Sequence, residues 1–144
     1  MAESTDYKNF KKNVPQAGDR LDRVENVVVT GMPDINFCSG GVECWIEQKS
    51  PIEPKRKTTP LFGSNHKVSQ EQANWMLRQR KAGGRCYFLI STDKRWILVG
   101  GFLADQLNTM TVDEIVDQSV WSTMKPVKDK EQWQTLRQEL QRSN

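Results

Sequence analysis

The segment GMPDINFCSGGVECWIEQKS, residues Gly31 to Ser50, contains the pattern that decides the fold. Two apolar runs flank the pair Gly40-Gly41, which predicts a β-hairpin made of two short strands. Both runs carry carboxylates and the second also carries a lysine, although a buried charge is costly in a small domain. These charges form either a site or an ordinary solvated face of the sheet.

Side chains alternate along a strand, so each run of the hairpin has two faces. One face is predicted to enter the core and carries the apolar residues Ile35, Phe37, Cys44 and Ile46. The opposite face then carries Asp34 from the first strand, and Glu47 and Lys49 from the second. A hairpin that joins the two strands brings all three ionisable groups to one side of the sheet.

Two carboxylates that lie close together repel each other unless a cation lies between them. Mg²⁺ prefers oxygen ligands and takes one or two carboxylates while it keeps several waters. A lysine beside such an ion can orient a water and offset charge on a phosphorus under attack, which indicates phosphodiester hydrolysis. The alternative is an ordinary surface pair, because 27% of the residues are charged and a Glu-x-Lys pair on an exposed strand is common by chance.

The rest of the chain predicts a mixed α/β domain with a central sheet flanked by helices. Residues 1–20 are expected to be a loosely ordered lead-in, and residues 21–144 a single domain. Besides the hairpin, the expected elements are a strand at 23–29, a helix between the cap Ser69 and Gly83-Gly84, strands at 85–91 and 96–101, and helices at 111–121 and 129–142.

Net charge, apolar stretches and the numbers of cysteines and histidines exclude several classes of protein. The 21 basic and 18 acidic residues give a net charge of +3, which by itself does not indicate nucleic acid. The polar N-terminus lacks the apolar centre of a signal peptide, and no apolar stretch is long enough to span a bilayer, so we expect an intracellular protein. Three cysteines with no Cys-x-x-Cys pair, and one histidine, argue against a disulfide framework and a zinc site.

The ordered set of motifs resembles the PD-(D/E)xK nuclease superfamily, in which Pro-Asp and Glu-x-Lys lie on adjacent strands of a hairpin. Within it, GMPDIN, WIEQKSP and the later SQEQ helix are similar to the virus-type replication-repair nuclease (VRR-NUC) branch. The resemblance runs from about Arg23 to Gly100 and implies a restriction-endonuclease-like fold.

The resemblance also implies roles for individual residues. Asp34 and Glu47, with the backbone carbonyl of Gln48, would hold Mg²⁺ or Mn²⁺, and Lys49 would position the attacking water. Family members often add an acid from an N-terminal helix, which the first twenty residues do not suggest here. Glu25 is the substitute metal ligand, with a salt-bridged surface glutamate as the alternative.

Gln72 matches the glutamine of the family's helix, which supports the lysine and the substrate phosphate. The spacing Ser69-x-x-Gln72 also fits a capping box, in which the glutamine only closes the start of the helix. Trp45 shares the face of Glu47, where it either walls the site or packs under a covering helix. Both pairs of alternatives stay open at the level of the sequence.

Basic side chains near the proposed site are candidate DNA contacts, although such charges are usually just solvated. They include the only histidine, which lies in the segment before the helix, and an arginine in the helix itself. The set is Lys55, Arg56, Lys57, His66, Lys67 and Arg78.

The predicted function is a divalent-metal-dependent DNA endonuclease that selects branched DNA, four-way junctions in particular. Small members of the resembled branch include resolvases of such junctions that work as homodimers, and residues 87–90 or the C-terminal helix are possible interfaces. The alternatives are a nickase or flap nuclease, and a non-catalytic DNA- or protein-binding module on the same scaffold. The compact chain also suggests a bacteriophage enzyme, which would act in the host cytoplasm.

Overall fold

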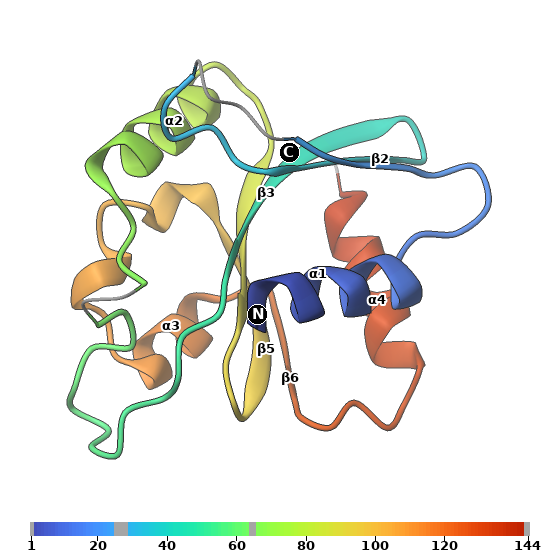
Figure 1. Ribbon diagram of the computed structural model, residues 1–144. Coiled ribbons are helices and arrows are strands. Elements are labelled where there is room, and N and C mark those ends of the chain that lie inside the picture. The colour runs from blue at the N-terminus through green and yellow to red at the C-terminus, as the bar shows by residue number, and fades with distance from the viewer. Residues whose placement is uncertain (1, 25–28, 64–65, 143–144) are drawn as a thin grey trace.

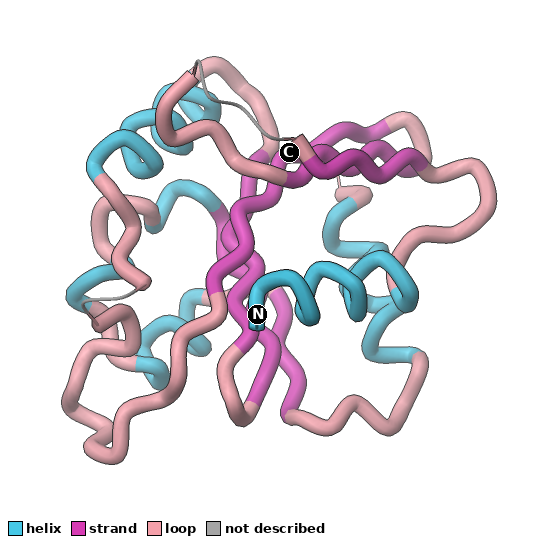
Figure 2. The backbone as a smooth tube through the Cα atoms, viewed as in Figure 1, coloured by secondary structure: helices cyan, strands magenta, loops and turns pink. Residues whose placement is uncertain are grey.

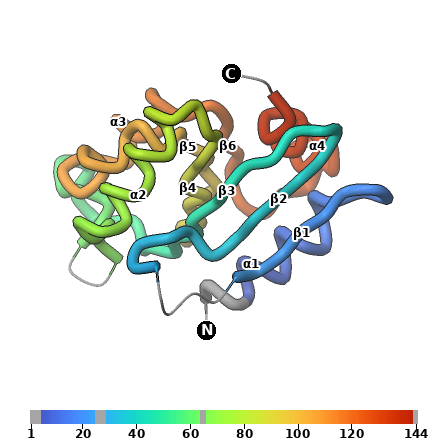
Figure 3. Tube along the Cα trace, turned by 90° about the horizontal axis from the view of Figure 1, so that it is seen from above, coloured from blue at the N-terminus to red at the C-terminus, as the bar shows by residue number. Residues whose placement is uncertain are grey.

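The computed structural model describes residues 2–24, 29–63 and 66–142. A central sheet separates two layers of helices (Figures 1 and 2). Figure 3, which looks down on the molecule from above, shows α1 and α4 on one side of the sheet and α2 and α3 on the other. In the described part of the chain, no helix is long and apolar enough to cross a membrane.

The sheet has six strands in the order β1-β2-β3-β4-β5-β6. All neighbouring strands are antiparallel except β3 and β4, which are parallel. The strands are β1 (Arg20–Arg23), β2 (Ile35–Ser39), β3 (Val42–Lys49), β4 (Cys86–Ser91), β5 (Arg95–Gly100) and β6 (Trp121–Met124). The single parallel pair requires a crossover between β3 and β4, and this crossover contains α2.

Four α-helices and two short 3₁₀ helices are described. The α-helices are α1 (Ala2–Asn13), α2 (Gln70–Lys81), α3 (Val112–Gln118) and α4 (Glu131–Leu140), and the 3₁₀ helices are η1 (Gly101–Leu103) and η2 (Leu107–Thr109). Capping boxes fix the starts of α2 and α3, where Ser69 and Thr111 each accept from the backbone N–H three residues on.

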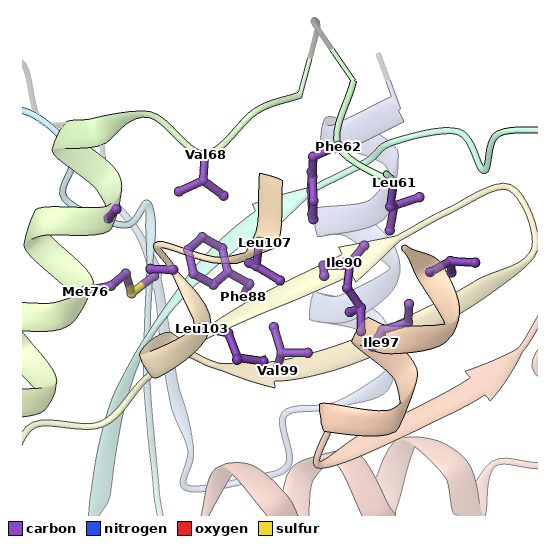
Figure 4. Close-up of a cluster of buried hydrophobic side chains, with 14 of the residues drawn as sticks. Leu61, Phe62, Val68, Met76, Phe88, Ile90, Ile97, Val99, Leu103 and Leu107 are labelled. Atoms are coloured by element: carbon purple, nitrogen blue, oxygen red, sulfur yellow. The ribbon is translucent and has the colours of Figure 1, made fainter. Parts of the chain in front are cut away.

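Each face of the sheet has its own hydrophobic cluster. The face under α2 and α3 contains Phe88, Ile90, Ile97 and Val99, and Figure 4 shows Phe88 beside Met76 of α2 and Leu107. The face under α1 and α4 contains the predicted inward residues of the hairpin, Ile35, Phe37, Cys44 and Ile46, all 0% exposed. The alternation predicted for the hairpin is confirmed.

The mixed α/β class, the hairpin within Gly31–Ser50, the two strands expected at 85–91 and 96–101 and the helix after Ser69 are confirmed, whereas the expectation for the N-terminus is wrong. Residues 2–13 form α1 rather than a loosely ordered lead-in, because Phe10 and Val14 are buried against the sheet. The first strand is Arg20–Arg23, and residues 25–28 of the strand expected at 23–29 lie outside the described residues. The helix expected at 111–121 ends at Gln118, and Trp121 begins β6.

Residues 88–90 and the apolar side of α4, which belong to the two predicted dimer interfaces, are buried in the core. Residues 87–90 lie in β4, which pairs with β3 on one edge and with β5 on the other, and Phe88, Leu89 and Ile90 are 0% exposed. The apolar side of α4, with Trp133 and Leu136, packs into the cluster under α1 and α4. Residues 88–90 and the apolar side of α4 are therefore not available to a second copy of the chain, whereas Glu131, Gln134 and Gln138 on the outer side of α4 are exposed.

The three cysteines are free thiols, as expected. Burial raises the pKa of Cys44 to about 12 and the pKa of Cys86 to about 11. Because the thiolate is the reactive form, these two thiols are inert at neutral pH.

Candidate active site

One amide side chain joins the two charged residues at the end of β3. Gln72, in the first turn of α2, donates from Nε2 to Glu47 Oε2 at 3.2 Å. The Gln72 Oε1 atom accepts from Lys49 Nζ at 3.0 Å. The carboxylate and the ammonium are therefore held on the α2 side of the sheet by one neutral group.

Gln72 makes the contacts expected of both predicted roles, because it closes the helix start and also contacts Glu47 and Lys49. Gln72 Oε1 also accepts from the backbone N–H of Ser69 at 3.1 Å, and Ser69 Oγ accepts from the backbone N–H of Gln72 at 3.1 Å. The capping box thus fixes the rotamer of Gln72, because its oxygen is tied to the helix start. The cap positions the amide that bridges Glu47 and Lys49.

Lys49 is the buried cation of the site, with 8% of the residue exposed. Its ammonium donates to Gln72 Oε1 and, at 3.3 Å, to the backbone oxygen of Lys67. A lysine ammonium has three N–H donors, so within the described part of the chain one donor is left for a water or a substrate oxygen. Two neutral acceptors orient the ammonium without cancelling its charge.

Asp34 lies in the bend directly before β2 and is half-buried. The β2–β3 register pairs Ile35 with Ile46, so one further step along both strands sets Asp34 opposite Glu47. The backbone oxygen of Asp34 accepts from the N–H of Val24 at 2.6 Å, which ties this bend to the end of β1. The predicted convergence of Asp34 and Glu47 agrees with this register.

Gly31 explains why the turn before Asp34 needs a glycine. Its φ is +85°, a region that other residues rarely adopt. A Cβ added at Gly31 would lie 2.4 Å from the backbone C and O of Glu71 and 2.8 Å from the N of Gln72. The turn that leads to Asp34 is thus in backbone contact with the helix turn that carries Gln72.

Helix α1 brings an acid that the sequence interpretation missed. Asp6 is 8% exposed, and its Oδ2 accepts from the hydroxyl of Ser50 at 2.7 Å, one residue beyond Lys49. The spacing Asp6, Phe10, Val14 places the three residues on one helix face and is the signal that predicts this helix. Glu25, proposed instead, lies outside the described residues.

The predicted DNA contacts do not form one cluster. Lys55, Arg56 and Lys57 are exposed on the loop that follows β3. His66 is half-buried and Lys67 is exposed, just before α2. Arg78 is exposed six residues beyond Gln72, which is about 9 Å along the helix axis.

Of the two positions predicted for Trp45, the structure shows the one under a covering helix. Its ring makes an edge-to-face contact with Trp75 of α2, with ring centroids 5.9 Å apart. It therefore packs under the covering helix and fastens α2 to β3 near Glu47.

The donor set fits a hard divalent ion held partly by water. Asp34 and Glu47 supply two carboxylates, which is the number that Mg²⁺ commonly takes from a protein. No group of three or more His, Cys, Asp or Glu side chains that could hold a metal occurs within residues 2–24, 29–63 and 66–142.

No protein-family model and no curated protein matches the sequence. Among solved structures, the chain is similar to one described as the 1.6 Å resolution structure of Hjc, a Holliday junction resolvase from the archaeal hyperthermophile Archaeoglobus fulgidus. The two chains are 22% identical with a TM-score of 0.44, and the match covers 69% of this chain and 74% of that chain. At this level of similarity, an activity has to be argued from the site itself.

Proposed function

We propose that the protein is a divalent-metal-dependent endonuclease that hydrolyses phosphodiesters in branched DNA, with four-way junctions as the preferred substrate. The observation that carries the proposal is the amide of Gln72, which holds Glu47 at 3.2 Å and Lys49 at 3.0 Å. An ordinary surface pair needs no such third group, whereas a site that must keep an acid and an amine in fixed positions does. This is the arrangement expected of the PD-(D/E)xK superfamily and its VRR-NUC branch.

Asp34, Glu47 and the backbone oxygen of Gln48 are the groups that would hold Mg²⁺ or Mn²⁺. When bound, such an ion supplies positive charge and lowers the pKa of a bound water. Lys49 orients the attacking water with its remaining N–H and stabilises negative charge that develops on the phosphoryl oxygens. Gln72 acts as a positioning residue, because it contacts both Glu47 and Lys49 and is itself fixed by the helix cap.

Cutting both strands at a four-way junction requires two such sites related by a two-fold axis, so we also propose a homodimer. The interface would not involve β4 or the apolar side of α4, because both are buried within the chain. Lys55, Arg56, Lys57 and Lys67 are the exposed cations that follow or precede the site and would contact phosphates.

The test is an assay on labelled four-way junction, flap, nicked and plain duplex DNA with Mg²⁺, Mn²⁺ or EDTA at one fixed salt concentration. We expect the wild-type protein to cut the junction fastest and only with a divalent ion. Lys49→Ala should lower the rate by about 10²-fold or more with junction binding retained, which is the usual loss when one transition-state donor is removed. Lys128→Ala, at an exposed position outside the site, is the matched control.

Junction binding without cutting, under every divalent ion, would identify a binding module instead. If flap or nicked DNA is cut faster than the four-way junction, that DNA is the preferred substrate instead. An unchanged rate in Lys49→Ala would remove this lysine from the mechanism.

A further inference from the structure

The loop between β3 and α2 contains a small apolar pocket next to the proposed site. Its volume is about 280 Å³, and the lining includes Pro51, Ile52, Pro54, Pro60, Leu61 and His66. Pockets for drug-sized ligands are larger, about 300–1,000 Å³, so this one suits a single planar ring system. Nothing in the proposed hydrolysis uses it.

Two segments of the loop that lines this pocket are anchored to the rest of the domain. Glu53 is buried, with 4% of its side chain exposed, and Arg95 of β5 binds it with two hydrogen bonds of 2.8 and 3.1 Å. Thr92 Oγ1 donates to Glu53 Oε2 at 2.7 Å, and the N–H of Glu53 donates to Asp93 Oδ1 at 2.9 Å. On the other side, Leu61 is 2% exposed within the core cluster. These contacts tie two of the segments that line the pocket to the sheet and to the core cluster.

Ile52 is unusual because it is 74% exposed while its neighbour Glu53 is buried. The anchor at Glu53 holds this apolar side chain at the rim of the pocket, next to the exposed cations Lys55, Arg56 and Lys57. An apolar rim flanked by cations complements a nucleotide, whose base is apolar on its faces and whose phosphate is an anion.

The pocket also lies close to the proposed reaction centre at both ends of the loop that lines it. Ile52 is three residues beyond Lys49, which limits their Cα separation to about 11 Å. His66 directly precedes Lys67, whose backbone oxygen lies 3.3 Å from Lys49 Nζ. The upper limit on the Cα separation corresponds to at most about three nucleotides along one strand, at about 3.4 Å of rise each.

We propose that this pocket accepts one unstacked nucleobase of the DNA strand, within about three nucleotides of the phosphodiester that is cut, with Ile52 against the face of the base. The proposal rests on the proposed nuclease function and adds a reason for selecting branched DNA. Taking a base out of its stack costs a few kcal/mol in a duplex and less where stacking is already interrupted, as it is where helices exchange strands at a branch point. Apolar wedge residues such as isoleucine are used in this way at distorted base steps.

The experiment measures junction binding in EDTA, so that cutting plays no part. A 2-aminopurine base is placed one to five nucleotides from the branch point, and its fluorescence is read with wild-type protein, Ile52→Ala and the control Met124→Ala. Met124 is also exposed, at 57%, but lies on β6. We expect the wild type and Met124→Ala to change the fluorescence at one position within about three nucleotides of the cut, and Ile52→Ala to lose this change.

The same titrations give affinities, which are then repeated on a junction with an abasic nucleotide at that position. On intact DNA, Ile52→Ala should bind about fivefold more weakly, the lower end of base-stacking effects. On abasic DNA the difference between wild type and Ile52→Ala should disappear, because the contact is already removed.

An equal loss of affinity on intact and abasic DNA, or no loss on either, would overturn the pocket proposal. Because these readings need no cutting, they are independent of the hydrolysis assay. A protein that cuts junctions but shows no coupling between Ile52 and a base keeps the nuclease function and loses the pocket. A wild-type protein that binds no junction would overturn both.

Discussion

Both faces of the sheet contain buried polar side chains, but the charged groups are paired differently on the two faces. Beside α4, Arg137 binds Asp19 directly, with hydrogen bonds of 2.7 and 3.0 Å between residues 118 positions apart. Under α2, an acid and an amine are joined through the neutral amide of Gln72. A direct ion pair neutralises both partners, whereas an amide bridge fixes their positions and leaves their charges in place.

This difference separates stability from function. The contacts beside α4 tie the two ends of the chain to the sheet, so we infer that they stabilise the fold. The contacts under α2 gather charges at the end of one strand, so we infer that they serve hydrolysis. Changes on one face should alter unfolding and leave cutting per folded molecule unchanged, and changes on the other face should do the opposite.

The largest expected effect is on the α1 face. Phe10 is 0% exposed and its ring packs edge-to-face on Phe37, with centroids 6.1 Å apart. Phe10→Ala should lower the free energy of unfolding by about 3–5 kcal/mol, measured by denaturant titration. The control is Phe102→Ala, where the ring is 42% exposed and the loss should be about 1 kcal/mol.

Two results with Phe10→Ala would contradict the separation of stability and cutting between the two faces of the sheet. Unchanged stability in Phe10→Ala would mean that α1 does not pack on the sheet. A lower cutting rate per folded molecule, under conditions where the variant stays folded, would mean that the α1 face also controls the site.

A smaller effect is expected at the ion pair beside α4, and it should depend on pH. The hydrogen bonds from Arg137 are the main cause that holds the pKa of Asp19 below its usual range. Because the folded-state pKa is lowered, the stabilisation is complete above the unfolded pKa of about 3.9 and is lost as the pH falls towards the folded value. Asp19→Asn should therefore cost about 1–3 kcal/mol at pH 7, and its gap to the wild type should close below about pH 4.

Asp22→Asn is the control for this prediction. Asp22 pairs with Arg20 at 2.9 Å, but the two side chains are 47% and 80% exposed, so the loss should stay within about 0.5 kcal/mol. A cost for Asp19→Asn that is the same at pH 3 and pH 7 would contradict the ion-pair explanation.

The smallest expected change in free energy concerns Gln72 and affects cutting alone. Gln72→Glu keeps an oxygen for the capping box but removes the N–H donor to Glu47 and places a second carboxylate beside it. We expect the cutting rate to fall about tenfold or more, equivalent to about 1.4 kcal/mol in the barrier, while the thermal midpoint is retained. Gln70→Glu, in the same helix turn but bonded to Asn74, should cut at the wild-type rate. A stable Gln72→Glu that cuts normally would reduce Gln72 to a helix cap.

The hairpin and α2 follow from local patterns, which is why the sequence predicts them. Alternation places Ile35 and Ile46 inward and Glu47 outward, and a Ser-x-x-Gln spacing marks the start of α2. Whether Gln72 serves the cap or the site depends on how far α2 lies from β3. The sequence does not contain that distance, so it could not decide between the two roles or predict the contact of Gln72 with Glu47.

The ends of the chain were harder to predict for a different reason. Helix α1 has only a sparse apolar stripe, Tyr7 and Phe10, which Val14 continues just beyond the helix end, and the sheet rather than intrinsic propensity stabilises it. Strand β6 has four residues and continues from the pattern of α3, so Trp121 fits a helix equally well until β5 is there to pair with it. Both elements depend on tertiary contacts.

The most direct measurement is a calorimetric titration of the protein with Mn²⁺, without DNA. We compare the wild type with Asp34→Asn, Glu47→Gln and the exposed control Asp113→Asn. The wild type and Asp113→Asn should bind one ion with the same affinity, and each of the other two variants should bind at least about tenfold more weakly. Equal affinity in all four proteins would contradict the claim that the hairpin assembles a metal-binding site at the end of β3.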